Sequence, residues 1–161
     1  MEEFLNRIHY GLFLWMKEMF RNAILKNVSR KKLKNEIKIF YSICDPKEGY
    51  IIGFTNHLFG YFYSGYSLFF SFILFGIKGM LCEIDDKVLT LIILGVPVFI
   101  GYIPAYRAVF TNDNYLKYYK KFEKKDARWH KKCKWITVAF CVGSILATAL
   151  GFLLMAVLVS I

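Results

Sequence analysis

Three long stretches of this chain contain no charged side chain, and they constrain its fold more than any other feature. They cover residues 58–77, 88–106 and 135–161. A helix crosses the hydrocarbon core of a bilayer with about 20 apolar residues, and each stretch is close to or above that length. A soluble protein spreads its apolar side chains over periodic faces instead. We therefore expect an all-α integral membrane protein with three transmembrane helices.

The net charge of +10 is placed unevenly around these spans. Residues 1–57 hold ten Lys and Arg against six Asp and Glu, and residues 107–134 hold ten against three. The connection of residues 78–87 has two lysines against three acids. Basic side chains mark the cytoplasmic face of a membrane protein. We therefore expect a multi-pass protein of the inner (cell) membrane, with its N-terminus in the cytoplasm and its C-terminus outside.

The region before the first span, residues 1–57, predicts helices rather than a further span. Apolar side chains recur at helical spacing through residues 4–25, which indicates an amphipathic helix in the headgroup layer or against the ends of the spans. Residues 33–44 fit a helix or a strand, and we favour the helix because a lone strand leaves its edges unpaired. Residues 45–49 form a turn by composition. The remaining residues, 58–161, form the three-span domain.

Residues 107–134 predict a basic cytoplasmic loop between the second and third spans. Residues 111–114 offer helix caps, and neither Gly nor Pro interrupts residues 114–142. We expect a basic helix that continues into the third span. Its basic and aromatic face comprises Lys117, Lys120, Lys121, Lys124, Lys125, Arg128, Trp129, Lys131 and Lys132. Anionic lipid headgroups are the expected partner, and a nucleotide or nucleic acid is the weaker alternative because the topology already explains the charge.

The third span carries small or weakly polar residues on one stripe of its helix. They are Thr137, Cys141, Ser144, Thr148 and Gly151, spaced four, three, four and three residues apart. Such residues let membrane helices approach closely and bond across the contact. They can instead line a hydrated path, which requires several copies of the chain in a ring because three helices enclose little volume.

The first two spans have comparable faces. Ser64 and Ser71 share one arc of the first span, and Thr90, Pro97 and Gly101 share a face of the second. A proline within a helix leaves one carbonyl without its donor, and such a carbonyl must face protein or water. For a path along these faces, the acidic outer mouth would be formed by Glu83, Asp85 and Asp86. Both interpretations, helix contact and pore lining, apply to all three spans.

The sequence gives no positive signal for chemistry. Nucleotide-binding, hydrolase-elbow and zinc-protease motifs are missing, and the three histidines are far apart. No Asp, Glu, Lys or Arg lies within the three spans, which argues against proton-coupled carriers and rotary motors. We therefore expect no catalytic residue, no cofactor and no metal site.

These observations favour a small oligomeric membrane channel or pore-forming effector, gated from its cytoplasmic side. One alternative is a non-catalytic accessory, immunity-like or scaffold subunit of a membrane complex. Another is a membrane-embedded lipid-modifying enzyme. The expected partners are the bilayer, further copies of the chain, and a second membrane protein in the accessory alternative.

Overall fold

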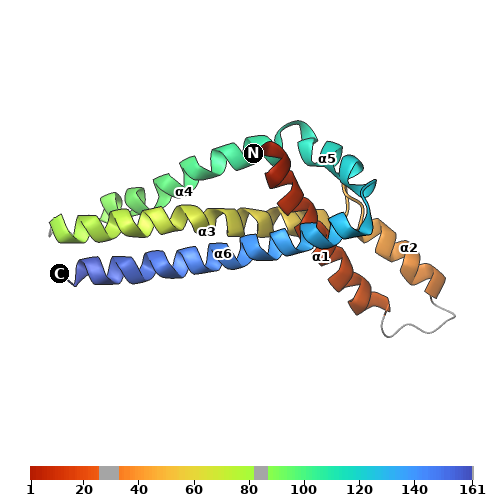
Figure 1. The fold of residues 1–161 in the computed structure, drawn as a ribbon, viewed down its shortest axis with the longest axis horizontal. Coiled ribbons are helices and arrows are strands. Elements are labelled where there is room, and N and C mark those ends of the chain that lie inside the picture. Colours follow the sequence, from red (N-terminus) through yellow and green to blue (C-terminus); the bar gives the residue numbers. More distant parts are fainter. Residues whose placement is uncertain (26–32, 82–86, 161) are drawn as a thin grey trace. The chain divides into compact units, whose positions relative to one another are not determined.

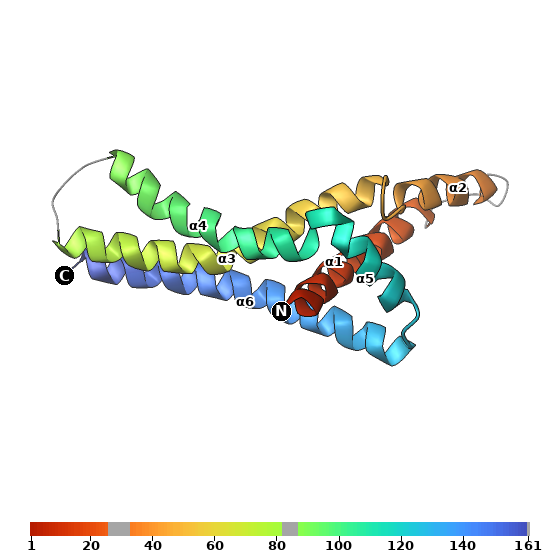
Figure 2. The ribbon, with the colours of Figure 1, turned by 90° about the horizontal axis from the view of Figure 1, so that it is seen from above.

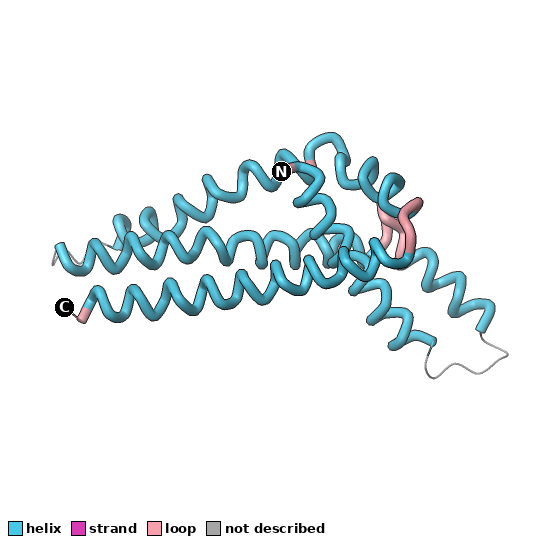
Figure 3. The backbone as a smooth tube through the Cα atoms, in the orientation of Figure 1, coloured by secondary structure: helices cyan, strands magenta, loops and turns pink. Residues whose placement is uncertain are grey.

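The structure, a computed structural model, describes residues 1–25, 33–81 and 87–160 (Figures 1 and 3). Its elements are α1 (Glu2–Leu25), α2 (Leu33–Ile43), α3 (Tyr50–Leu81), α4 (Lys87–Val109), the 3₁₀ turn η1 (Thr111–Asp113), α5 (Asn114–Glu123) and α6 (Ala127–Val159). No strand occurs within these described ranges, so the all-α prediction is confirmed. The ambiguous segment after residue 32 is the helix α2.

Three of these helices, α3, α4 and α6, are long and apolar enough to cross a membrane. They coincide with the three charge-free stretches, so the prediction of three candidate spans is confirmed. The bilayer needs about 20 residues, whereas α3 has 32 and α6 has 33. The first ten or so residues of both helices are therefore free to pack with other parts of the chain.

The chain divides into two compact units. The polar unit comprises Met1–Phe59 and Ala108–Val138, and the apolar unit comprises Gly60–Arg107 and Ala139–Ile161. The sequence-based boundary after residue 57 lies close to the first division. The loop of residues 107–134, which the sequence analysis grouped with the spans, packs with the N-terminal region.

In the polar unit, α1 packs against α2 and α5. Its side chains Ile8, Leu12 and Phe13 are almost fully buried, together with Ile51 and Phe59 from the first turns of α3. Burying one such side chain contributes about 1.5–3 kcal/mol. The helix predicted for residues 4–25 is therefore held by tertiary packing.

In the apolar unit, α4 runs antiparallel to α3. Ser71 Oγ donates a hydrogen bond to the carbonyl of Leu94 (3.0 Å), and Lys78 Nζ donates to Thr90 Oγ1 (3.1 Å). Residue numbers thus rise along α3 as they fall along α4. Lys78 lies in the last turn of α3, where a cation complements the helix dipole.

The contact between α3 and α6 in the apolar unit is parallel (Figures 1 and 2). Gly65 lies against Thr148, and Gly76 lies against Leu158. Because α4 runs the other way, the three helices alternate in direction. This alternation is what three consecutive spans of one membrane require.

The basic segment differs from its prediction in one respect. The sequence predicted a helix running without interruption from residue 114 into the third span, but α5 ends at Glu123 and α6 begins at Ala127. Asp126 Oδ1 accepts a hydrogen bond from the Trp129 backbone N–H (3.2 Å), which caps the start of α6. The interruption between α5 and α6 therefore coincides with an N-capping aspartate, Asp126, and not with a Gly or Pro. From Ala127 onward α6 is continuous with the third charge-free stretch.

The turn of residues 111–114 also differs from its prediction, because these residues do not cap α5 with their side chains. Asn112 and Asp113 have positive φ angles of 55° and 52°, and Asp113 precedes α5 without a side-chain capping bond. Asn and Asp tolerate this left-handed conformation better than other non-glycine residues. The side chain of Asn114 instead stabilises the turn. Its Nδ2 donates to the carbonyl of Ala108 (3.1 Å) and to Glu2 Oε1 (2.6 Å).

Candidate functional site

A buried histidine lies at the centre of the polar unit. His9 is fully enclosed, and edge-on aromatic contacts surround its ring, with centroids 5.4–5.5 Å from those of Phe59, Phe110 and Tyr115. Its Nε2 is 2.8 Å from Asn56 Oδ1, and its Nδ1 is 3.1 Å from the Tyr119 hydroxyl. An amide oxygen only accepts, so Nε2 donates to Asn56 and Nδ1 accepts from Tyr119.

The protonation state of His9 follows from its surroundings. Burial lowers the pKa of His9 from 6.5 to about 4, and the hydrogen bond to Asn56 opposes this only in part. His9 is therefore neutral at pH 7. A neutral imidazole has one N–H donor and one acceptor nitrogen, which matches the bond donated by Nε2 and the bond accepted by Nδ1. Both ring nitrogens are engaged. This arrangement suits a residue that joins helices rather than one that transfers protons.

A second polar contact joins α1 to the end of α4. Asn6 is buried, and its Nδ2 donates to the carbonyl of Ala108 (2.9 Å) and to the carbonyl of Glu2 (3.0 Å). Asn6 lies one turn before His9 on the same face of α1. The polar unit is therefore organised around two buried polar side chains, each bonded to a segment distant in sequence. The Asn6 Nδ2 is satisfied in this way, whereas its buried Oδ1 has no hydrogen-bond partner among the described residues.

The start of α6 packs directly against α1. Thr137 Oγ1 donates to the carbonyl of Cys133 (3.0 Å) and is 3.5 Å from the carbonyl of Ile8. Cys133 Sγ donates to the carbonyl of Arg7 (3.2 Å). Gly11 makes this approach possible, because a Cβ there would collide with Thr137 Oγ1. Thr137, the first residue of the predicted stripe, is thus buried within the polar unit.

The rest of that stripe lies in the apolar unit, where it contacts α3. Ser144 is buried against Gly65, and Thr148 Oγ1 donates to the carbonyls of Gly65 (3.1 Å) and Ser144 (3.0 Å). Gly151 lies so close to Phe69 that an added Cβ would be 2.9 Å from its Cα. Cys141 is buried too, at 9% exposure. All five stripe residues therefore face other parts of the same chain.

The predicted polar residues of the first two spans also lie at helix contacts. Ser71 is buried and bonds to α4 as described above. Gly101 meets Ser67, whose Oγ a Cβ at this position would strike. Thr90 accepts its bond from Lys78. These contacts hold α3 and α4 together at three levels.

A shallow apolar groove runs beside these contacts. It has a volume of about 480 Å³, and its lining includes Ser64 from α3 and Gly95 and Tyr102 from α4. Pro97 is half-buried on the same helix. Ser64 is the single hydroxyl of the predicted polar set that borders this open space.

The acidic outer-mouth residues, Glu83, Asp85 and Asp86, lie outside the described residues. Their role stays a prediction from the sequence alone. The predicted cytoplasmic basic residues are described, and Lys117, Lys120, Lys121, Lys124, Lys125, Arg128, Lys131 and Lys132 are all exposed. Trp129 differs from them, because it packs against Phe122 (centroids 4.9 Å apart) under the Arg7 guanidinium (4.7 Å).

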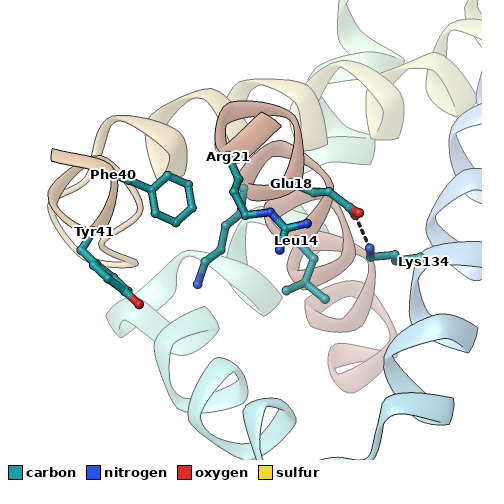
Figure 4. A pocket seen from close by; sticks show the side chains of 7 residues that line it. Leu14, Glu18, Arg21, Phe40, Tyr41 and Lys134 are labelled. Atoms are coloured by element: carbon teal, nitrogen blue, oxygen red, sulfur yellow. Dashed lines mark hydrogen bonds and ion pairs between the residues drawn. The ribbon is translucent and has the colours of Figure 1, made fainter. Parts of the chain in front are cut away.

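A charged groove of about 380 Å³ lies in the polar unit (Figure 4). α1 contributes Leu14, Lys17, Glu18 and Arg21 to its lining. α2 contributes Phe40 and Tyr41, and α6 contributes Lys134. Glu18 forms an ion pair with Lys134 across the groove, and the hydrogen bond and charge of Lys134 lower the pKa of that carboxyl, with a smaller effect from Arg21.

Comparison with known proteins gave no significant match to a family model, to a curated protein or to a solved structure. Function must therefore be argued from the residues and their geometry.

Sequence reasoning missed the buried polar centre and the charged groove. Asn6 and His9 stand among Leu5, Ile8 and Leu12, at helical spacing with them. Two polar residues inside an apolar face signal buried hydrogen bonds, but their partners are not adjacent in sequence. No sequence pattern indicates the charged groove, because its cations come from two helices that are distant in sequence, α1 and α6.

Proposed function

We propose that this chain is a non-catalytic accessory subunit of a membrane complex, anchored by its three spans. The observation that carries the proposal is the placement of the small and hydroxyl-bearing residues of α6. Ser144, Thr148 and Gly151 are used in contacts with α3 of the same chain. Ser144 and Gly151 are buried in this contact, and Thr148 donates its hydroxyl proton to carbonyls of α3 and α6. Ser144 and Thr148 border an open groove of about 530 Å³. Large apolar side chains such as Phe62 and Phe72 make up most of its lining, which suits a lipid or helix contact better than a hydrated path.

The outward surface of the apolar unit supports the same proposal. Large apolar side chains are exposed along all three helices, among them Phe99 (74% exposed), Leu91 (71%) and Leu153 (61%). In a bilayer, such side chains contact lipid or the helices of another membrane protein. The polar unit, whose buried hydrogen bonds join distant segments, would then be the rigid part that a partner recognises.

The test compares this proposal with the channel expectation. Purified full-length chain in nanodiscs should have the mass of one copy, and in planar bilayers it should pass no current above background. A photo-crosslinker at Phe99 in native membranes should give a discrete adduct with a different protein. A ring of copies that passes current, with a selectivity that changes when Glu83, Asp85 and Asp86 are neutralised together, would establish the channel instead.

The membrane orientation is part of the proposal. The charge distribution places the N-terminus and residues 107–134 in the cytoplasm, and the connection after α3 outside. A variant whose only thiol is Cys82 should react with an impermeant maleimide in intact cells. A variant whose only thiol is Lys124→Cys should react only after the membrane is opened. Lys124 is exposed, whereas Cys44 is buried and would report poorly. The opposite labelling pattern would reverse the orientation.

A further inference from the structure

We propose that the groove lined by Lys17, Arg21 and Lys134 binds a phosphate group, supplied by a phospholipid headgroup. This proposal goes beyond the accessory function, because a headgroup site could serve a channel equally well. The groove lies entirely within the polar unit, with its cations on α1 and α6.

The charges of the groove are unbalanced. Lys17 and Arg21 are four residues apart on α1, where like charges one turn apart destabilise a helix. Among the described residues, neither forms an ion pair with a carboxylate. Glu18 is the single acid of the lining and is engaged by Lys134. Three cations thus face one anion, and the excess positive charge would stabilise a bound anion.

The chemistry of the lining favours phosphate over a smaller anion. A guanidinium presents several donors in a fixed plane, and ammonium groups add point charges, a combination that suits the several oxygens of a phosphate. Phe40 and Tyr41 form an apolar side of the groove, with Phe40 buried and Tyr41 67% exposed at the rim. In Figure 4, Arg21 lies between these rings and the Glu18–Lys134 pair. A ligand with a charged head and an apolar body fits both sides.

The place of the groove along α6 points to a lipid as the source. Lys134 is followed directly by Trp135, which is 66% exposed and begins the third charge-free stretch. Tryptophan concentrates at the depth of the headgroups in membrane proteins. Lys134 of the groove precedes Trp135 by one residue, so its ammonium group would lie at the depth of the lipid phosphates.

The test measures lipid retention by the purified full-length chain in native mass spectrometry. Dioleoyl phosphatidylglycerol is the probe, and dioleoyl phosphatidylcholine is the comparison lipid of equal chain length. The double variant Lys17→Gln/Arg21→Gln should weaken phosphatidylglycerol retention about tenfold, since each lost charge pair changes affinity several-fold. Lys124→Gln/Lys125→Gln removes the same charge from an exposed turn outside the groove and should retain the lipid like the unmodified chain.

A second variant tests the direction of the effect without weakening the groove. Glu18→Gln removes the competing anion from Lys134 and should increase phosphatidylglycerol retention a few-fold. Glu123→Gln adds the same charge at an exposed position of α5 and should leave retention unchanged. Equal losses in both double variants, or equal gains in both glutamate variants, would reduce the effect to bulk charge and overturn the site.

A competition arm identifies the source of the phosphate. Inorganic phosphate and glycerol phosphate at millimolar concentration should displace phosphatidylglycerol weakly if the groove is built for the whole lipid. Complete displacement that depends on Lys17 and Arg21 would keep the phosphate site and assign it to a soluble ligand. Unchanged lipid retention in the Lys17→Gln/Arg21→Gln variant, at an unchanged melting temperature, would refute the proposal.

Discussion

Replacing His9 with alanine should lower the free energy of unfolding of the polar unit by about 3–5 kcal/mol. The change opens a cavity inside a ring of aromatic side chains and leaves Asn56 and Tyr119 without their shared partner. The measurement is thermal unfolding in detergent, followed by tryptophan fluorescence. Few single substitutions elsewhere in the chain should have a comparable effect.

His57 provides a matched control for His9. It is the same residue type, one position after the Asn56 that bonds to His9, but its side chain is exposed. Substitution of an exposed side chain usually changes stability by less than about 0.5 kcal/mol. If His9→Ala and His57→Ala melted alike, His9 would not be the buried polar centre of this unit.

The same unfolding measurement can be repeated at lower pH. The direction in which the free energy of unfolding changes follows from the lowered pKa of His9. In the unfolded chain His9 takes up a proton near its ordinary pKa of 6.5, whereas in the folded chain it does so at about 4. As the pH falls through this window the unfolded state binds more protons, so stability falls by up to about 1.4 kcal/mol per pH unit. Above pH 6.5 there is no such loss, and below pH 4 it stops growing.

The useful range for this measurement is pH 6.5 to 5. The lowered pKa values of Glu18 and Asp45 make those carboxylates stabilising above their ordinary values of 4.5 and 3.8, and that contribution is lost on further acidification. Between pH 6.5 and 5 the unmodified chain should lose about 1.6 kcal/mol. His9→Ala should be less stable throughout and should lack most of this slope. An equal slope in both proteins would assign the acid sensitivity to other groups.

The sequence predicts those parts of the fold that depend on local composition. Charge-free stretches of about 20 residues identify α3, α4 and α6, because an uninterrupted apolar run of this length is typical of a membrane-spanning helix. The turn at Asp45 is also predictable, since its carboxylate accepts the backbone N–H groups of Lys47 (2.7 Å) and Glu48 (2.9 Å). Both features are fixed by residues that are neighbours in sequence.

The candidate sites were less predictable because their partners are distant in sequence. His9 meets Asn56 and Tyr119, and no periodicity in residues 4–25 indicates which polar residue finds a buried partner. The stripe on α6 illustrates the intermediate case. Its spacing predicted that one face makes contacts, but the spacing cannot distinguish α3 of the same chain from a second copy.

Replacing Gly151 with leucine should force α3 and α6 apart and lower the free energy of unfolding of the apolar unit by roughly 1–3 kcal/mol. The nearest atoms to an added Cβ are the Cα (2.9 Å) and carbonyl oxygen (3.1 Å) of Phe69, which are backbone and have no rotamer to change. Gly65 differs in this respect, since the atoms nearest to a Cβ there are the hydroxyls of Ser144 and Thr148. Gly151→Leu should therefore lower the melting temperature in detergent more than Gly65→Ala.

Ala149→Leu is the matched control. Ala149 is exposed on the same helix, and a leucine side chain is stable on a surface that faces lipid. Native mass then separates contact within one chain from contact between copies. If the stripe joins α6 to α3 of its own chain, Gly151→Leu reduces stability and leaves the number of copies unchanged. If the stripe instead joins copies, the same substitution shifts the complex to smaller species, and the folded monomer melts like the unmodified chain. The second outcome would restore a ring of subunits, and with it the wall that a channel requires.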